Sequence, residues 1–214
     1  MWKFVKRLIY IVIILNVLGI VAGKFFNPPI TLTQIDGILK YGKLKRDYIP
    51  YDEMGDNVKK AVLASEDQLF FNHKGFDYKA IEKAYKDNES GKKLKGGSTI
   101  SQQTAKNIFL WQGRSWLRKG LEAFYTFIIE SVWSKEIILE RYLNSVEMGQ
   151  GVFGVQAAAE YYFGKSAKDL TKTEAAWIAT VLPNPQKYNP KNPTPYLKKK
   201  HSWILRQMNN IKLQ

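Results

Sequence analysis

The amino-terminal run of apolar residues limits most strongly what this chain can fold into. Residues 8–22 are 15 uncharged residues in succession. A helix of that length spans about 22 Å, and one continued to Phe26 spans about 28 Å, against a hydrocarbon core of about 30 Å. The longer helix requires Lys24 to extend its ammonium to the lipid headgroups. We therefore expect residues 1–26 to contain a cytoplasmic amino terminus and a transmembrane helix.

The charges beside this run indicate the orientation of the chain. The basic residues that precede the run are Lys3, Lys6 and Arg7. By the positive-inside rule, the rest of the chain lies on the outer face of the cytoplasmic (inner) membrane, periplasmic or extracellular. A cleaved signal peptide is the alternative, since Val21, Ala22 and Gly23 are small enough to resemble a cleavage site. We favour an uncleaved single-pass anchor because the apolar run is long for a signal core.

Composition narrows the classes of function. The 214 residues suffice for one ordinary domain with a sizeable core. A net charge of +14 indicates anionic partners such as headgroups, phosphates or nucleic acid, and an outer location argues against nucleic acid. The absence of cysteine excludes disulfides and thiolate chemistry. With His73 and His201 as the two histidines, a histidine-based metal site is not expected.

The residues after the anchor divide into a connector, residues 27–50, and a domain, residues 51–214. The connector contains Pro28, Pro29 and alternating apolar residues in ITLTQI, which predicts an extended chain and no sheet of any size. From Tyr51 onward, apolar residues recur at spacings of three and four, which is typical of amphipathic helices. The sequence therefore predicts an all-α fold.

Polar residues mark several expected helix boundaries. The residues expected to cap helix starts are Asp77, Ser98, Thr99 and Thr171. Thr171 also forms a predicted capping box with Glu174. From Pro183 the segment PNPQKYNPKNPTP predicts an irregular strap, followed by a last basic helix around residues 196–211.

The first candidate for catalysis lies in residues 65–77, SEDQLFFNHKGFD. Glu66 and Asp67 follow an apolar helix and precede aromatic residues. A carboxylate beside apolar surface is desolvated, which shifts its pKa toward neutrality and suits it to act as a general base. Spacing alone leaves two alternatives open: the two carboxylates face solvent, and His73 packs or caps a turn.

The second candidate segment, residues 96–110, reads GGSTISQQTAKNIFL. Ser98 and Thr99 can cap a helix, and exposed amides in its first turn would form an anion site supported by the helix dipole. Gln102, Gln103 and Lys106 follow on successive turns beside that site. Phosphate recognition is a natural use of this arrangement. An ordinary capped helix with a solvated polar face is the alternative.

The third candidate segment, residues 111–130, reads WQGRSWLRKGLEAFYTFIIE. Its cations lie close in sequence to Lys106 and could grip a pyrophosphate together with it: Arg114, Arg118 and Lys119. Glu122 follows the basic pair by three and four positions, so an ion pair is the alternative to a functional role.

Aromatic residues in and beside this segment suit a membrane interface. Trp111 and Trp116 are of the type found there, and residues 109–116 are the expected surface that dips into the membrane. Core packing is the alternative for the aromatics that follow, namely Phe124, Tyr125 and Phe127.

In order, these segments resemble the motifs of one enzyme family. Three blocks are similar to its E-D-x-x-F-x-x-H-x-G, G-G-S-T-I-x-Q-Q and R-K-x-x-E signatures: SEDQLFFNHKGFD, GGSTISQQTAKNIFL and RKGLEA. Two longer blocks resemble the remaining motifs: KEIILERYLNSVEMGQGVFGVQAAAEYYFGK and LTKTEAAWIATVLPNPQKYNP. Over roughly residues 48–191 the chain thus resembles the family 51 peptidoglycan glycosyltransferases.

Two details refine this resemblance. The chain ends soon after the fifth motif, as in the monofunctional form that lacks a penicillin-binding transpeptidase domain. Gln68 stands where members often have a basic residue, which changes the local electrostatics of the first motif. The implied fold is all-α and two-lobed, similar to lysozyme, with a smaller lobe that dips into the membrane.

The resemblance implies that the enzyme polymerises lipid II into glycan strands for the bacterial cell wall. In the implied inverting transfer, Glu66 is the catalytic base, polyprenyl pyrophosphate is released, and Glu122, as the second essential glutamate, positions cations or a metal. The implied substrate-binding residues are Ser98, Thr99, Gln102, Gln103, Lys106, Arg114, Arg118 and Lys119. A divalent cation, Mg²⁺ or Mn²⁺, could share the pyrophosphate charge, with Asp67 or Glu122 as a candidate ligand.

The expected partners are lipid II, the growing glycan chain on polyprenyl pyrophosphate, membrane lipids and other proteins of cell-wall synthesis. A muramidase or lytic transglycosylase is the nearest rival, because a glutamate in a lysozyme-like cleft also cleaves glycan. A hydrolase would leave the clustered cations unexplained. The rival from another class is a catalytically inert, membrane-tethered binder of glycan or anionic lipid.

Overall fold

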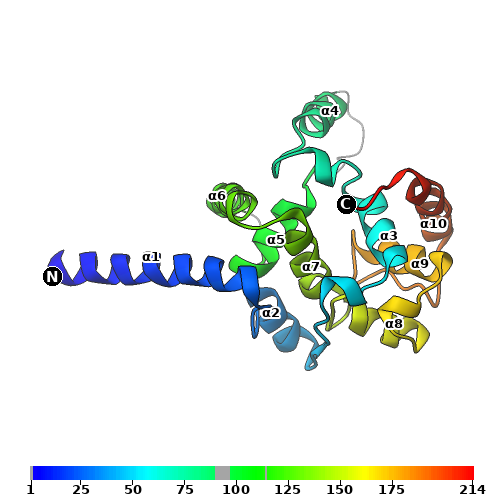
Figure 1. Cartoon of the computed structure of the whole chain (residues 1–214), viewed down its shortest axis with the longest axis horizontal. Helices are drawn as coiled ribbons and strands as arrows, with labels where there is room; N and C mark the ends of the chain where they lie inside the picture. The colour runs from blue at the N-terminus through cyan, green and yellow to red at the C-terminus, as the bar shows by residue number, and fades with distance from the viewer. Residues whose placement is uncertain (1, 90–96, 114) are drawn as a thin grey trace.

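The computed structural model describes residues 2–89, 97–113 and 115–214 and is mostly helical, as predicted (Figure 1). The α-helices are α1 (Trp2–Phe25), α2 (Leu32–Tyr41), α3 (Asp56–Glu66), α4 (Tyr78–Glu89), α5 (Ile100–Phe109), α6 (Trp116–Val132), α7 (Lys135–Ser145), α8 (Val155–Phe163), α9 (Lys172–Val181) and α10 (Pro195–Gln207). Short 3-10 helices are η1 (Tyr51–Glu53), η2 (Phe70–Asn72), η3 (Ala167–Asp169) and η4 (Met208–Asn210). The strands are β1 (Lys45–Arg46), β2 (Glu147–Gly149) and β3 (Val152–Phe153).

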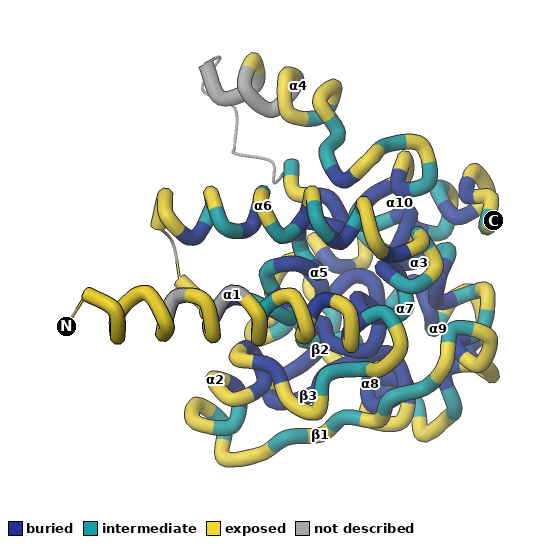
Figure 2. Tube along the Cα trace, turned by 60° about the vertical axis from the view of Figure 1, so that its left-hand side comes forward, coloured by how far each residue is buried: buried dark blue, intermediate teal, exposed yellow. Residues whose placement is uncertain are grey.

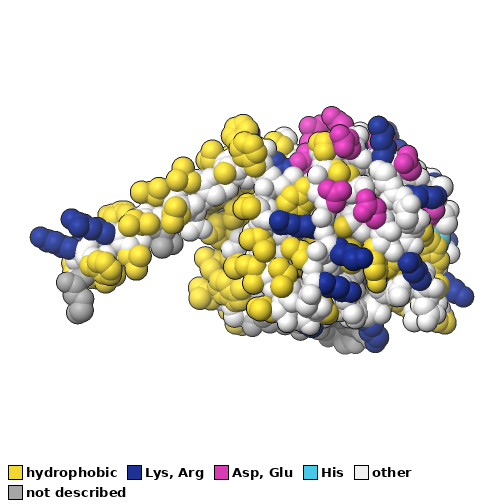
Figure 3. Space-filling model, turned by 90° about the horizontal axis from the view of Figure 1, so that it is seen from below, with side chains coloured by type: hydrophobic (Ala, Val, Ile, Leu, Met, Phe, Trp, Pro, Cys, Tyr) yellow, Lys and Arg dark blue, Asp and Glu magenta, His cyan; other side chains and the backbone are white. Residues whose placement is uncertain are grey.

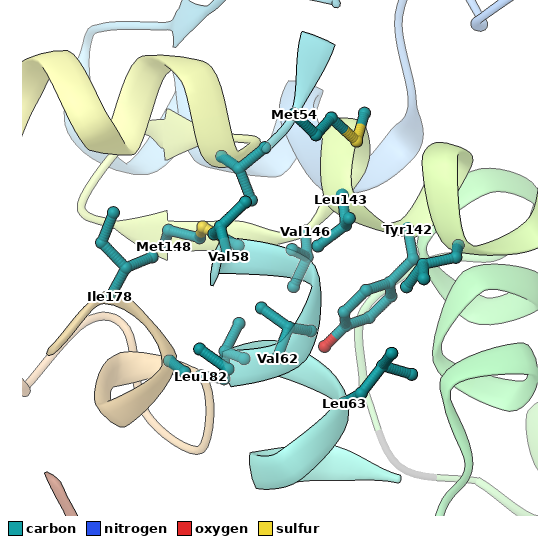
Figure 4. Close-up of a cluster of buried hydrophobic side chains, with 14 of the residues drawn as sticks. Met54, Val58, Val62, Leu63, Tyr142, Leu143, Val146, Met148, Ile178 and Leu182 are labelled. Atoms are coloured by element: carbon teal, nitrogen blue, oxygen red, sulfur yellow. The ribbon is translucent and has the colours of Figure 1, made fainter. Parts of the chain in front are cut away.

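The strands form one small sheet in the order β1-β3-β2, with β1 parallel and β2 antiparallel to β3. The helices pack in two groups. In one group α3 lies against α9 and α10, and in the other α5 lies against α6 and α7. Figure 4 shows the core where α3, α7, β2 and α9 meet. The helices α3 and α5, which contain parts of the first two candidate segments, therefore belong to different groups.

The carboxyl-terminal half of α1 is docked on the rest of the protein. The indole N–H of Trp133 donates a hydrogen bond of 2.9 Å to the carbonyl of Ile20, and Arg141 Nε donates one of 2.8 Å to the carbonyl of Gly23. Tyr125 on α6 donates to the Asn16 side chain. The Trp133 ring packs so closely on Gly23 that an added Cβ would lie 2.7 Å from a ring carbon.

The amino-terminal half of α1 extends away from the body, with exposed apolar side chains (Figures 1 and 2). Within the described ranges, no helix combines the length and the apolar character that crossing a membrane requires. The single-pass anchor, and the choice between it and a cleaved signal peptide, stay predictions.

The prediction that residues 27–50 form an extended connector is wrong for part of this segment, because residues 32–41 form α2. Thr31 and Gln34 form a reciprocal capping box: Gln34 N donates to Thr31 Oγ1 at 3.2 Å, and Thr31 N donates to Gln34 Oε1 at 3.1 Å. This box starts a helix within a segment whose apolar alternation suggested extended chain. Gly42 ends the helix with a φ of 64°, and Gly37 packs against the Phe153 ring.

Most of the other predicted boundaries agree with the structure, except that Ser98 is not the cap of α5 and that α10 ends at Gln207, before η4. Thr99 and Thr171 are the N-caps of α5 and α9, and each forms a capping box. Asp77 accepts a hydrogen bond of 2.9 Å from the Ala80 amide at the start of α4. The strap after Pro183 is irregular, and α10 follows it, one residue earlier than predicted at its start.

Candidate functional site

The carboxylate of Glu66 lies at the end of α3 and is held on both oxygens. Ser65 Oγ donates a hydrogen bond of 2.9 Å to Oε1, and Gln103 Nε2 donates one of 3.1 Å to Oε2. The ammonium of Lys200 on α10 lies 4.0 Å from Oε1. The Glu66 side chain is 14% exposed, so it is reachable without facing open solvent. Both groups of helices therefore contribute to the position of this carboxylate.

Gln103 links Glu66 to the core. The hydroxyl of Tyr142 donates a hydrogen bond of 3.0 Å to Gln103 Oε1, which leaves the Gln103 amide group to donate to Glu66. Tyr142 is fully buried, and burial, reinforced by the negative charge of Glu66, holds the pKa of its hydroxyl well above the ordinary value. The hydroxyl thus stays protonated and remains a donor.

Asp67 has a different role from its neighbour. Its carboxylate contacts His73 Nε2 at 2.9 Å and accepts a hydrogen bond of 2.9 Å from the backbone amide of Ile100. Its side chain is 3% exposed, so the solvent-facing alternative is wrong for Asp67. The contacts attach the loop after α3 to the first residue of α5. His73 is a packed histidine, as in the alternative that sequence left open.

The first turn of α5 does not offer the exposed amides that sequence predicted. The Ile100 amide is bonded to Asp67, and the Gln102 amide donates to Thr99 Oγ1 at 3.2 Å. The Gln102 side chain in turn accepts from the Thr99 amide at 3.0 Å, so both side chains serve the capping box. Contact of Thr99 or Gln102 with substrate stays a prediction.

A buried carboxylate organises the predicted cations of α6. Glu122 is 3% exposed and forms ion pairs with Arg118 NH1, at 2.8 Å, and with Lys119 Nζ. The Lys119 ammonium also lies 3.5 Å from the hydroxyl of Ser98, an exposed residue just before α5. The ion-pair alternative for Glu122 is therefore confirmed, and the same pairs hold two cations beside the start of α5.

Lys106 adds a third positive charge to this group. Burial lowers the pKa of Lys106, the negative charge of Glu122 opposes that shift, and the charges of Arg118 and Lys119 add to it. Arg118 Nε is buried without a hydrogen-bond partner among the described residues. Three cations around one carboxylate leave an excess of positive charge that suits an anionic ligand. The predicted contribution of Arg114 lies outside the described residues.

The carboxylates proposed as metal ligands do not fit a divalent cation. The oxygens of Asp67 are engaged by His73 and the Ile100 amide, and those of Glu122 by two cations. Among the described residues, no three Asp, Glu, His or Cys side chains group as metal ligands. A metal at Glu122 would also be repelled by the neighbouring cations. We therefore derive no step that uses a metal ion.

Two clefts flank the Glu66–Gln103 hydrogen bond. One, of about 380 Å³, has Glu66, Asp67, Ser98 and Thr99 in its wall. The other, of about 410 Å³, has Gln103 and Lys106 in its wall, together with Leu182 and the first residues of the strap, 183–186. A substrate could reach Glu66 from one cleft and the cation Lys106 from the other.

Comparison with known proteins identifies the family. The family model described as Transglycosylase matches residues 33–209. The chain belongs to the transglycosylase family. A relative from Mannheimia succiniciproducens named biosynthetic peptidoglycan transglycosylase is 53% identical over 80% of this chain and 70% of its own length. A relative of the same name from Pseudomonas aeruginosa is 53% identical over 77% of this chain and 71% of its own length. One from Caulobacter vibrioides is 43% identical over 94% of this chain and 91% of that one.

For this transglycosylase, the family resemblance seen in the sequence is thus confirmed. Three residues at or beside the site were not predicted from the sequence: Glu147 lies in the wall of the cleft that contains Lys106, Tyr142 contacts Gln103, and Lys200 lies near Glu66. Tyr142 and Glu147 stand within the fourth motif block, where neither was given a role at the site, and Lys200 lies in the predicted basic helix. Lys200 and Tyr142 lie far from Glu66 in the sequence, so local spacing gave no signal for either.

Proposed function

We propose that the chain polymerises lipid II into glycan strands by an inverting transfer that releases polyprenyl pyrophosphate. The observation that carries the proposal is the oriented carboxylate of Glu66 beside the cation group of Lys106, Arg118 and Lys119. A base and a set of cations are the two requirements of a reaction in which a hydroxyl displaces a pyrophosphate.

In this proposal Glu66 is the general base. The 4-hydroxyl of the acceptor's GlcNAc attacks the anomeric carbon of the donor's MurNAc, and its proton passes to the Glu66 carboxylate. The bond between that carbon and the pyrophosphate oxygen breaks, so the configuration changes from α to β. General-base catalysis of this kind contributes about 10²- to 10⁴-fold in rate. Gln103 and Ser65 fix the orientation of the carboxylate, and the Lys200 ammonium lies 4.0 Å from it.

The cations stabilise the departing pyrophosphate. Lys106, Arg118 and Lys119, with Arg114 from the sequence motif, balance the charge that develops as the bond breaks. Glu122 holds two of these cations in place, so its proposed role is positioning. Ser98, Thr99, Gln102 and Gln103 are the proposed polar contacts to phosphate or sugar. A divalent cation that assists would enter with the pyrophosphate, and adding EDTA to the polymerisation assay tests that proposal.

The exposed apolar surfaces of α1 and α6 support a proposed membrane location. The two helices are neighbours, and Figure 3 shows hydrophobic side chains over α1 and the adjoining face of the body. The most exposed apolar residues of α6 are Trp116, Leu117, Phe124 and Phe127. We propose that these dip into the bilayer to which α1, as a single-pass anchor, attaches the enzyme.

The proposed dipping surface includes the exposed tryptophans of the one expected at residues 109–116, Trp111 (44% exposed) and Trp116 (90% exposed), and differs from it at Phe109 and Leu110. Phe109 stacks on Tyr125 with ring centroids 4.9 Å apart, and Leu110 is 2% exposed, so these two residues belong to the interior. The proposed surface thus keeps the two tryptophans and extends along α6. Core packing was the alternative considered for the aromatic residues of α6. It is correct for Tyr125 and wrong for Phe124 and Phe127, which are 57% and 67% exposed.

The proposed reaction is distinguished from glycan cleavage by one pair of incubations. The enzyme is incubated with lipid II and, separately, with finished glycan strands, and the products are separated by length. Growth of chains from lipid II with no shortening of finished glycan supports the proposal. Shortening of finished glycan without chain growth would overturn it in favour of a muramidase or lytic transglycosylase.

A further inference from the structure

The inner face of α6, opposite its exposed apolar residues, carries a buried carboxylate to which the proposed mechanism gives no role. Glu122, Thr126 and Glu130 recur every four residues along α6, a spacing that places them on one side of the helix. Glu122 holds the cations, as described above. The Glu130 side chain is 8% exposed, and a charge at that depth is costly unless other groups compensate it.

Glu130 joins α6 to the starts of two helices that orient Glu66. The hydroxyl of Ser101, the second residue of α5, donates a hydrogen bond to Glu130 Oε1. The ammonium of Lys135, the first residue of α7, donates one of 2.7 Å to the same oxygen and lies 4.4 Å from the centre of the Phe70 ring. Since α5 carries Gln103 and α7 carries Tyr142, one carboxylate holds both helices of the hydrogen-bond chain behind Glu66.

Gly75 allows the loop after α3 to lie against the same face of α6. A Cβ added at Gly75 would lie 2.8 Å from Thr126 Cγ2 and 3.0 Å from Glu130 Cγ, and its φ of 85° also favours glycine. The carbonyl of Gly75 accepts a hydrogen bond of 2.6 Å from Thr99 Oγ1 at the start of α5. The loop is therefore packed between α6 and the first turn of α5.

The contact between Ser101 and Glu130 fixes the rotation of α5 about its own axis. Ser101 and Gln103 are two positions apart, which is about 200° around a helix, so they point to nearly opposite sides. On one side Ser101 bonds to α6, and on the other Gln103 bonds to Glu66 and accepts from Tyr142. A rotation that breaks the first contact would move the Gln103 amide away from the Glu66 carboxylate.

We propose that Glu130 is a positioning residue for the transfer reaction, which acts through Ser101 on α5 to hold the Gln103 amide against Glu66. The inference rests on the proposed function and adds a residue that contacts neither the substrate nor the reacting atoms. A misplaced base slows the chemical step, so loss of the contact lowers kcat and leaves KM.

The test is steady-state polymerisation of lipid II by Ser101→Ala, which removes the hydroxyl and leaves Glu130 paired with Lys135. Alanine has the highest helix propensity, so the variant keeps α5. We expect kcat to fall about tenfold, with KM within about twofold of wild type. Ser131→Ala is the matched control, because its exposed hydroxyl bonds to the Phe127 carbonyl within the same helix, and both constants should stay as in wild type.

A second background separates positioning from support of the fold alone. In Gln103→Ala no amide remains to be positioned, so adding Ser101→Ala should lower kcat by less than about twofold. An equal loss of kcat in the two backgrounds would overturn the proposal, since the effect would then not pass through Gln103. Glu130→Gln keeps the shape of the side chain but weakens both of its hydrogen bonds, lowers kcat in the same direction, and decides the matter if Ser101→Ala fails to fold.

The failure of this inference is distinguishable from failure of the proposed function. If wild type polymerises lipid II while Ser101→Ala keeps its kcat or changes KM alone, the positioning role is refuted and the proposed function stands. If wild type does not polymerise lipid II, the proposed function itself fails, and the positioning role with it.

Discussion

The side-chain amide of Gln103 donates a hydrogen bond of 3.1 Å to the carboxylate of Glu66 and joins two helices that lie far apart in the sequence. Behind it, Tyr142 donates to the other end of the same amide. This chain of donors fixes which way the Glu66 carboxylate points. A general base that is oriented before substrate arrives loses less entropy in the transition state.

Tyr142→Phe tests this chain of hydrogen bonds. The ring stays in the core, while Gln103 Oε1 loses its donor, so we expect a loss of stability of about 1–3 kcal/mol. We also expect kcat for lipid II polymerisation to fall about tenfold with KM little changed, because orientation of the base affects the chemical step. Thermal unfolding and steady-state kinetics measure the two effects. An unchanged kcat in a folded variant would show that Tyr142 has no part in positioning Glu66.

Glu122→Gln tests whether the buried carboxylate positions the cations. Breaking a buried pair leaves Arg118 without its counter-charge, which predicts a loss of about 3 kcal/mol in the free energy of unfolding. The double variant Arg118→Met with Glu122→Met removes both buried charges and should recover most of that stability without recovering polymerisation. Recovery of both stability and polymerisation would mean that the pair is merely structural.

Alkaline pH should weaken lipid II binding through Lys106. Because burial lowers the pKa of Lys106, its ammonium loses its charge at a lower pH than the ordinary 10.5, and affinity for a pyrophosphate falls as pH rises through that range. Lys106→Arg keeps its charge throughout and should move the fall in affinity to higher pH. Binding curves at several pH values measure this.

Lys200→Arg is the matched control, since burial also lowers the pKa of Lys200 but its ammonium lies beside Glu66. We expect the pH dependence of binding to stay as in wild type. The same alkaline fall in Lys106→Arg and wild type would contradict the assignment of Lys106 to the pyrophosphate.

Gly23→Ala tests the docking of α1. The new Cβ would lie 2.7 Å from a carbon of the Trp133 ring, so the helix must shift, at a cost of about 1–3 kcal/mol. Gly19→Ala on the same helix is the control, because its Cβ would meet no atom within 4 Å. The midpoints of thermal unfolding in detergent compare the two variants. Equal midpoints for the two variants would show that α1 is not docked through Trp133.

The parts of the fold that sequence predicted correctly are those set by neighbouring residues. The capping boxes at Thr99 and Thr171 join residues three positions apart, so their residue types alone identify them. The same signal was present at Thr31, but apolar alternation in that segment outweighed it, and α2 was missed.

The site residues that stand in sequence motifs could be predicted. The contacts between segments that are distant in the sequence could not. Glu66 and the basic residues of α6 stand in recognisable motifs. The occupied amide of Ile100 could not be foreseen, because it depends on how Asp67 reaches across from the preceding loop. The approach of Lys200 to Glu66 depends likewise on the packing of α10 against α3.

The central claim, that Glu66 is the base of a lipid II polymerase, is tested most directly by the initial rate of polymerisation by Glu66→Gln. We predict a fall of about 10²- to 10⁴-fold, with lipid II binding retained, because the amide keeps the shape of the side chain but cannot accept the proton. Polymerisation by a folded Glu66→Gln variant at the wild-type rate would contradict this claim.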